Sequence, residues 1–430
     1  MVAELRSIMM NTLRKRIAIV GTGIAGLTAA YLLRRRHDVT VFEAADYVGG
    51  HTNTVGVDLD SGHWDVDTGF IVHNPKAYPN FVALLQQLGV SSAPTEMSFS
   101  VKSLRSGLEY GASGLRRLFA QKRNALRPSF YRMLLDVRRF YCEAPELLEA
   151  GGDDSTTLGE YLERKRFSRP FIEDHLIPYG AAIWSASADD MYAFPARFFA
   201  HFFHNHGFLS TQKPAWRVIE GGSQRYVEKL IEPFRHDIRL RTPVKSIRRD
   251  EEGVRITTAN GSSPELFDEV ILALHSDQAL RLLSDPSSQE TDVLGKLGYQ
   301  ENQVLLHTDE KVLPKRRDAW ASWNYHVPAE KQSRVSVTYN MNLLQSLQAP
   351  ETFCVTLNGV EAIDEGRVLK EITYHHPRYT LDSITAQRRR AQICGVRHTH
   401  YCGAYWGYGF HEDGVVSALE VTRRFGEPAI

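Results

Sequence analysis

Chemically versatile side chains gather in residues 400–414, which read HYCGAYWGYGFHEDG. His411 and Glu412 are of the types that orient a substrate or transfer a proton, and solvated or structural roles for both remain equally open. No metal site is expected, because adjacent residues do not converge on one ion and the helical HExxH spacing is absent. The glycines would let backbone N–H groups approach a ligand, and the aromatics suit the wall of a flat, polar pocket.

A second chemical signal lies near the amino terminus, where residues 16–43 read RIAIVGTGIAGLTAAYLLRRRHDVTVFE. A short apolar strand, 17–20, runs into Gly21-x-Gly23-x-x-Gly26 and then into a sequence typical of a helix. A second strand, 39–42, ends at Glu43. Gly21 permits the tight turn, Gly23 permits close approach of a pyrophosphate, and Gly26 permits helix–sheet packing. The helix N-terminus attracts phosphate, and Glu43 would accept hydrogen bonds from ribose hydroxyls.

Two further glycine-containing segments follow the dinucleotide motif. They read Tyr-Val-Gly-Gly-His-Thr at 47–52 and Asp-Val-Asp-Thr-Gly-Phe at 65–70. A nicotinamide cofactor must exchange, whereas a resident flavin is enclosed by several segments of the chain. The additional segments therefore favour FAD over NAD.

Glu43, Gly49-Gly50 and Asp67-x-Gly69 together resemble the FAD-binding amino terminus of the flavin amine oxidase, protoporphyrinogen oxidase and phytoene desaturase superfamily. The family usually has Arg where this chain has His51, which implies a weaker or titratable cation near the pyrophosphate. It also usually has an acid where this chain has Ala404, so Glu412 or Asp413 would have to bind the ribityl chain instead. The resemblance implies that FAD contacts Gly21, Gly23, Ile24, Ala25, Gly26, Glu43, Ala44, Gly49, Gly50, His51, Thr52, Gly69, Phe70, Val244, Gly403, Ala404, Asp413, Gly414 and Val415.

The strands and helices expected around these residues indicate an α/β (α+β) fold. It comprises an FAD-binding Rossmann-like domain of the glutathione reductase type and a discontinuous substrate domain of mixed sheet and helices. The expected FAD-binding segments are 14–76, 211–275 and 395–430, and the expected substrate segments are 77–210 and 276–394. Within 211–275, a helix opening at 221–226 and a β-meander over 238–258 lead to a buried strand at 269–274. The resemblance implies that Val244 lends its backbone to the adenine.

Composition excludes some classes of protein. The 430 residues carry 51 basic and 51 acidic side chains, so the chain lacks the charge of a general nucleic-acid binder. Its four cysteines form no CxxC pair, which suits a reducing compartment. No run reaches 18 apolar residues, so we expect a cytoplasmic protein, at most peripheral at the inner face of the membrane.

Two stretches of the expected substrate domain suggest contact with lipid. Residues 116–139 are basic and partly amphipathic, and such a surface can lie on anionic lipid, although a solvated helical face explains the pattern as well. Phenylalanines recur near helical spacing from Phe194 to Phe208, which would suit an acyl tunnel or ordinary core packing.

The resemblance also bears on the reaction. Amine oxidases of the superfamily use a lysine near flavin N5, but the strand region 302–310 contains no lysine. We therefore expect an oxidoreductase that dehydrogenates, desaturates or otherwise modifies a fatty acyl or phospholipid chain by hydride transfer to the flavin. The alternatives are a flavin amine or amino-acid oxidase and a flavoprotein partner of a lipid methyltransferase. The last follows because Cys402–Gly414 and several other stretches resemble a bacterial branch associated with cyclopropane fatty acyl phospholipid synthases.

Overall fold

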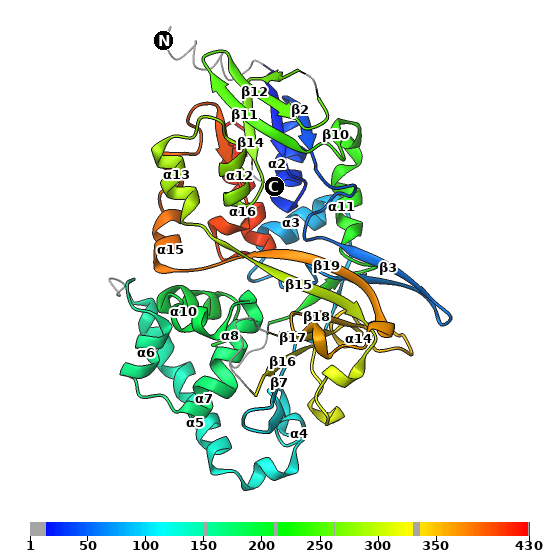
Figure 1. Cartoon of the computed structure of the whole chain (residues 1–430), viewed down its shortest axis with the longest axis vertical. Coiled ribbons are helices and arrows are strands. Elements are labelled where there is room, and N and C mark those ends of the chain that lie inside the picture. The colour runs from blue at the N-terminus through cyan, green and yellow to red at the C-terminus, as the bar shows by residue number, and fades with distance from the viewer. Residues whose placement is uncertain (1–13, 150–153, 210–213, 262, 330–335, 429) are drawn as a thin grey trace.

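The computed structural model describes residues 14–149, 154–209, 214–261, 263–329, 336–428 and 430. It places the predicted nucleotide-binding domain above the predicted substrate domain along the long axis (Figure 1). Two separate hydrophobic cores, one in each domain, account for this division. The predicted α/β fold is confirmed, and the second domain is built from separate segments of the chain.

A five-stranded parallel sheet forms the centre of the nucleotide-binding domain. Its strands lie in the order β10 (Ile238–Arg239), β2 (Asp38–Phe42), β1 (Arg16–Val20), β14 (Glu269–Leu272) and β20 (Thr399–Tyr401). Residues 17–20 are buried, as expected for a parallel strand that is covered on both faces. Strands from the beginning, middle and end of the chain thus share one sheet.

Helices and a small meander surround this sheet. The predicted meander is present as β11 (Val244–Asp250) and β12 (Gly253–Thr258), and β13 (Glu265–Phe267) extends it in a second antiparallel pair. Its predicted start at 238 is wrong, because residues 238–239 form β10, which pairs with β2 in the parallel sheet. The helices that contribute to this core are α2 (Ile24–Leu33), α3 (Pro79–Leu88), α11 (Gln224–Ile231), α12 (Ser276–Leu282), α13 (Ser288–Gly295), α15 (Leu381–Gln387) and α16 (His411–Arg423).

The substrate domain combines a seven-stranded mixed sheet with a group of helices. In sheet order the strands are β19 (Val368–Pro377), β15 (Tyr299–His307), β18 (Cys354–Leu357), β17 (Ser336–Asn340), β16 (Trp323–Val327), β7 (Phe99–Ser103) and β8 (Leu108–Gly111). The helices are α4 (Gly114–Leu118), α5 (Pro128–Glu143), α6 (Leu158–Arg164), α7 (Arg169–Phe171), α8 (Ile177–Trp184), α9 (Ala188–Tyr192), α10 (Ala196–Asn205) and α14 (Met341–Leu344).

Two long antiparallel strands connect the domains. β15 and β19 pair from Tyr299 opposite Pro377 to His307 opposite Val368, and they cross the middle of the molecule in Figure 1. Tyr299 packs against the first core, whereas Val304 and Leu306 lie in the second. The pair therefore lies at the boundary between the domains and contributes side chains to both hydrophobic cores.

Short strands complete the connections near the interface. A hairpin of β3 (Thr54–Leu59) and β4 (Gly62–Asp67) follows the glycine pair. A three-stranded sheet joins β5 (Val72–His73), β9 (Arg217–Ile219) and β6 (Ser92–Pro94). This sheet joins the first and second nucleotide-binding segments directly, because β5 pairs with β9.

The predicted domain boundaries differ from the packing in three places. Helix α3 packs in the nucleotide-binding core through Phe81, so the boundary at 77 falls too early. Helices α12 and α13 belong to the same core through Ala279 and Val293, which moves the boundary at 276 later. Ala386 of α15 also joins it, so the boundary at 395 falls late. Apolar faces decide these limits, and the boundary at 210/211 lies outside the described residues.

Candidate functional site: a nucleotide cradle and an adjoining cavity

The first glycine motif has the backbone shape that a dinucleotide turn requires. Gly21 has φ of +104°, and a Cβ atom there would lie 2.5 Å from the Ala273 carbonyl oxygen. A Cβ atom on Gly26 would lie 2.1 Å from the Gly21 carbonyl oxygen. Gly23, in contrast, faces open space, with no heavy atom within 4 Å of its Cβ position. Gly21 and Gly26 therefore serve packing, and Gly23 leaves room beside the helix.

Helix α2 begins at this open position. Gly23 is its N-cap and provides no side-chain cap, and no acid lies in the first turn. Ile24 and Ala25 open the helix and are buried. An uncapped N-terminus presents N–H donors and a positive dipole end, which together suit a phosphate group.

Glu43 lies at the carboxyl end of β2 and holds the loop that contains Thr22. Its carboxylate accepts hydrogen bonds from the Thr22 N–H at 3.1 Å, from the Thr22 hydroxyl and from the Ala45 N–H at 2.9 Å. A carboxylate has about four acceptor positions, so one remains for a ribose hydroxyl. Glu43 thus holds the Thr22 loop and keeps one acceptor position for the predicted bond to ribose.

The segment around Glu43 also fixes the position of Val244. The Glu43 carbonyl accepts the Thr242 N–H at 2.8 Å, and the Ala45 carbonyl accepts the Arg241 N–H at 2.9 Å. Ala44 lies between these two bonds. These two bonds hold Arg241 and Thr242, just before Val244, against the segment that carries Glu43.

The second and third glycine segments meet through their backbones. A Cβ atom on Gly69 would lie 2.2 Å from the His51 carbonyl oxygen, which accepts the Phe70 N–H at 2.7 Å. A Cβ atom on Gly50 would lie 3.2 Å from the Gly23 Cα atom. Gly49 has φ of +130° and accepts the Thr52 N–H at 3.0 Å. The residues of the amino-terminal segments that are predicted to contact FAD therefore lie close to one another.

The two ends of the chain converge at this site. A Cβ atom on Gly414 would lie 2.7 Å from the Ile24 Cγ2 atom, so the first turn of α16 lies on the first turn of α2. Val415 is fully buried beside it. The Gly403 N–H donates to the Ser417 hydroxyl at 2.9 Å, and the Ala404 carbonyl accepts the N–H groups of Gly407 and Gly409. Helix α16, in red, lies against α2, in blue (Figure 1).

His411 occupies a buried position within this junction. Its ring stacks on Phe70 with centroids 3.5 Å apart, and Nε2 lies 3.0 Å from the hydroxyls of both Thr52 and Tyr226. Burial holds the pKa of His411 well below its ordinary value, so the ring is neutral. These contacts favour an anchoring role over the predicted proton transfer.

Glu412 likewise makes structural contacts. Its carboxylate accepts the backbone N–H of Asn80 at 3.1 Å, the Asn80 side chain at 2.7 Å and the Phe81 N–H at 2.9 Å. It therefore caps α3, whose own N-cap residue makes no side-chain cap. This geometry argues against Glu412 as a catalytic base and against its predicted role on the ribityl chain.

Asp413 closes the aromatic loop before α16. Its carboxylate accepts the Phe410 N–H at 2.9 Å, and backbone N–H groups of Tyr408 and Gly409 also stabilise its charge. Burial outweighs these donors and raises the pKa of Asp413 to about 7. The carboxylate is thus engaged by its own loop rather than placed for a ribityl hydroxyl.

His51 differs from the titratable cation that the sequence suggested. Burial, together with the nearby His375, lowers the pKa of His51 to about 4. The ring stacks on Tyr374 with centroids 4.8 Å apart and lies 5.4 Å from the ring of His376. At neutral pH it is an uncharged ring, because no acid compensates for its desolvation.

Residues that sequence reasoning missed lie around His51, namely Tyr374 and His376 of β19 and His275, the N-cap residue of α12. His275 stacks on Tyr299 with centroids 4.1 Å apart, and burial lowers the pKa values of His275 and His376 to about 3. The Tyr-His-His run at 374–376 was the only sequence signal for this histidine–tyrosine cluster. Within the described parts of the chain, no group of three His, Cys, Asp or Glu residues could hold a metal.

These residues fit a bound dinucleotide. The N-terminus of α2 is uncapped, Gly23 faces open space, and the buried Nε2 atom of His51 has no hydrogen-bond partner. A phosphate-bearing ligand with polar ring atoms would satisfy all three features. The chain's own residues would bind its phosphates through α2 and would surround its ring with aromatic side chains.

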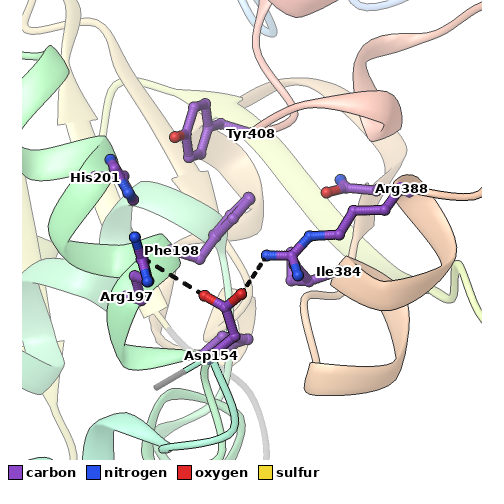
Figure 2. Close-up of a pocket in the computed structure, with 9 residues that line it drawn as sticks. Asp154, Arg197, Phe198, His201, Ile384, Arg388 and Tyr408 are labelled. Carbon is purple, nitrogen blue, oxygen red and sulfur yellow. Dashed lines mark hydrogen bonds and ion pairs between the residues drawn. The ribbon is translucent and has the colours of Figure 1, made fainter. Parts of the chain in front are cut away.

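A cavity of about 350 Å³ opens beside the aromatic loop, between α10 and α15. Asp154 lies between two arginines, 2.7 Å from Arg388 and 3.5 Å from Arg197 (Figure 2). The rings of Phe198 and Tyr408 pack 4.5 Å apart at its wall. The lining residues are Asp154, Pro195, Arg197, Phe198, His201, Ile384, Gln387, Arg388 and Tyr408.

The cavity is linked to the aromatic loop by hydrogen bonds. The Gln387 side chain donates to the carbonyls of Tyr405 and Gly407, both at 2.7 Å. Trp184 donates to the Tyr408 carbonyl at 3.2 Å. One loop therefore forms part of the cavity wall and leads directly into α16 at the nucleotide cradle. Sequence reasoning missed Arg197 and Arg388, because no local pattern pairs either arginine with Asp154.

Comparison with known proteins identifies a matching family and similar proteins. The family model described as flavin containing amine oxidoreductase matches residues 24–351. An L-amino-acid oxidase of Pseudechis australis is 24% identical over 333 residues, covering 68% of this chain and 57% of that protein. A carotenoid phi-ring synthase of Streptomyces griseus is 29% identical over 310 residues, covering 64% and 55%. The chain thus spans somewhat more than half the length of these two curated relatives.

A solved structure gives the same fold at low identity. A fatty acid isomerase from P. acnes that produces CLA matches 95% of this chain and 98% of its own, with a TM-score of 0.67 and 18% identity.

Proposed function

Because this chain belongs to the flavin containing amine oxidoreductase family, we propose that it is an FAD-dependent oxidoreductase acting on a fatty acyl chain, free or within a phospholipid. The flavin, when bound, would supply hydride acceptance from a substrate carbon. FAD is favoured over a shorter flavin because Glu43 and the segment leading to Val244 form a site suited to the adenosine half. The chain's residues would bind the cofactor and position the substrate.

The cavity beside the aromatic loop carries the substrate assignment. Two guanidinium groups, those of Arg197 and Arg388, converge on the Asp154 carboxylate there, and each carries N–H donors of the kind that bind an anionic group. Burial and the Arg197 charge lower the pKa of His201, so this ring adds no cation near neutral pH. Ring faces of Phe198 and Tyr408 complete the wall. Such a site suits a hydrocarbon with an anionic end and disfavours an ammonium group.

The strand that borders the nucleotide-binding domain supports the same conclusion. β15 reads YQENQVLLH and contains no lysine. Related amine oxidases would be expected to have a lysine in this strand, so its absence argues against amine oxidation. The structural similarity to a fatty acid isomerase is consistent with an acyl substrate.

Oxidation of an amino acid is the second candidate. An L-amino-acid oxidase and an L-amino acid dehydrogenase are among the curated relatives. An α-carboxylate would pair with Arg197 or Arg388 as readily as a fatty acid carboxylate would. The two candidates therefore differ in the apolar part of the substrate.

Anaerobic mixing separates these candidates. We expect an unsaturated fatty acid or phospholipid to bleach the flavin absorbance near 450 nm, whereas L-amino acids and alkylamines leave it unchanged. Arg388→Gln should weaken substrate binding by about tenfold, since a charge-assisted hydrogen bond contributes about 1.5–3 kcal/mol. Arg389→Gln is the matched control, because Arg389 is the next residue but pairs with Asp292, outside the cavity. Bleaching by amino acids alone would contradict the acyl assignment.

A flavoprotein without independent turnover is the third candidate. It rests on the resemblance to the branch associated with cyclopropane fatty acyl phospholipid synthases. In that case phospholipid would leave the flavin oxidised unless a lipid methyltransferase of this type were added. The same anaerobic assay, run with and without the methyltransferase, distinguishes this partnership from autonomous catalysis.

A further inference from the structure

The end of the substrate domain farthest from the nucleotide cradle exposes an unusual amount of apolar surface. Nine large hydrophobic side chains are exposed among the described residues, and five of them lie between 104 and 135. Their exposed fractions are 62% for Leu104, 75% for Leu115, 86% for Leu126, 44% for Tyr131 and 63% for Leu135. More than half of the exposed large hydrophobic side chains of the described residues thus lie in this short part of the chain, which sets it apart from the rest of the described surface.

These side chains come from neighbouring elements. They lie in the β7–β8 turn, α4, the 3-10 helix η1 (Lys122–Leu126) and α5. Arg123 and Arg127 both donate to the Gly107 carbonyl, which ties η1 to the β7–β8 turn. The Tyr131 hydroxyl donates to the Ala125 carbonyl at 3.0 Å, which ties α5 to η1. Figure 1 shows α4 and α5 at the lower end of the molecule.

Positive charge accompanies the exposed leucines. Residues 104–139 contain nine basic and two acidic residues in a chain with no net charge. Both acids face inward, because Glu109 is 8% and Asp136 is 2% exposed. Asp136 accepts the Ser168 N–H and contacts Arg132 and Arg139. The solvent-facing side of this stretch is therefore basic and apolar.

Acids from adjoining elements neutralise only part of this charge. Four more acids pair with these cations: Glu173 with Arg105, Asp318 with Arg116, Glu96 with Arg117 and Glu143 with Arg139. Cations still outnumber all these acids by nine to six. No described helix is long and apolar enough to cross a bilayer, so contact would be from one side.

We propose that this end, formed by residues 104–139, docks on the surface of an anionic lipid bilayer. Leu104, Leu115 and Leu126 insert into the headgroup–acyl boundary, and the surrounding arginines pair with lipid phosphates. A protein partner would more often present a shaped cavity to such isolated leucines, whereas a fluid bilayer adapts to them. This inference goes beyond the proposed function, because binding to vesicles requires neither flavin nor turnover.

Vesicle co-sedimentation of the full-length holoprotein tests the proposal. We expect binding to vesicles of phosphatidylcholine with phosphatidylglycerol, little binding to phosphatidylcholine alone, and weaker binding at high salt. Leu115→Glu combined with Leu126→Glu should reduce binding at least about tenfold, since both leucines lose the gain from leaving water and the new carboxylates repel anionic lipid. Both positions are exposed, so the fold should persist, as circular dichroism and retained flavin absorbance would confirm.

A matched double variant provides the control. Leu240→Glu with Val396→Glu changes two exposed apolar side chains of the nucleotide-binding domain, which are 40% and 44% exposed. It should bind anionic vesicles like the unmodified protein. Absence of binding to anionic vesicles, or equal loss in both double variants, would overturn the proposal. Flavin bleaching by a short, soluble acyl substrate should be unchanged in either variant, which separates this result from the test of the proposed function.

Discussion

Three consecutive residues at the start of α16 serve three different neighbours. Successive helical side chains point about 100° apart, so they cannot act on one substrate atom. His411 reaches Thr52 and Tyr226, Glu412 reaches the start of α3, and Asp413 turns back to its own loop. This cluster of acid–base residue types therefore holds the cradle together.

Asp413 makes stability depend on pH. Its pKa is raised from 3.8 to about 7, so its contribution is fully present below about pH 4 and is lost as pH rises through about 7. Asp413→Asn keeps an acceptor oxygen and removes this titration. We expect the free energy of unfolding of the unmodified protein to fall, relative to the variant, by a few kcal/mol between pH 4 and 8. Urea unfolding at several pH values measures this difference, and parallel curves would contradict it.

At the scale of elements, α16 stabilises the end of another helix. Helix α3 begins with Pro79 at its first position and has no side-chain cap of its own. The Glu412 carboxylate supplies the acceptors and also suits the positive end of the helix dipole. Two helices that are distant in sequence are thereby joined next to the nucleotide cradle.

Replacing Glu412 should therefore reduce stability more than activity. Glu412→Ala should lower the free energy of unfolding by about 1–2 kcal/mol, because it leaves helix N–H groups unpaired. Glu412→Gln should recover part of this loss, since its amide oxygen still accepts. Glu420→Ala on the same helix is the control, because the Glu420 side chain is half exposed and caps no helix. Lost turnover with unchanged urea midpoints would instead identify Glu412 as catalytic.

At the scale of the whole molecule, the cradle is assembled from segments that are far apart in the chain. β1, β14 and β20 are adjacent in one sheet, and α2 packs on α16. A ligand that contacts all of these segments binds only the folded protein. Its binding energy is therefore added to the stability of the nucleotide-binding domain.

FAD should therefore stabilise protein that has been stripped of flavin. At a concentration one hundred times its dissociation constant, the expected gain is about 2.7 kcal/mol, seen as a higher Tm in calorimetry. FMN and NAD should have smaller effects at equal concentration. Gly23→Trp should abolish the gain by filling the space beside α2, whereas Gly295→Trp, also facing open space, should retain it. A gain with FAD that persists in Gly23→Trp would place the cofactor elsewhere.

Local patterns in the sequence determined the main features of the nucleotide-binding half. The strand, the glycine spacing and the helix around Gly23 depend on neighbouring residues, and the structure has them at the predicted positions. The strand that ends before Glu43 and the meander after Val244 follow from alternation and turn residues in the same way. These features could be predicted from the sequence because each signal is contained within a few neighbouring residues.

Only the tertiary structure decided what the polar residues do. The charge of His51 depends on burial against β19, and the role of Glu412 depends on where α3 begins. The pairing of Asp154 with Arg197 and Arg388 joins residues separated by up to 234 positions, which no local pattern records. Desolvation and hydrogen bonding are set by packing between distant segments, so side-chain chemistry was settled by the fold.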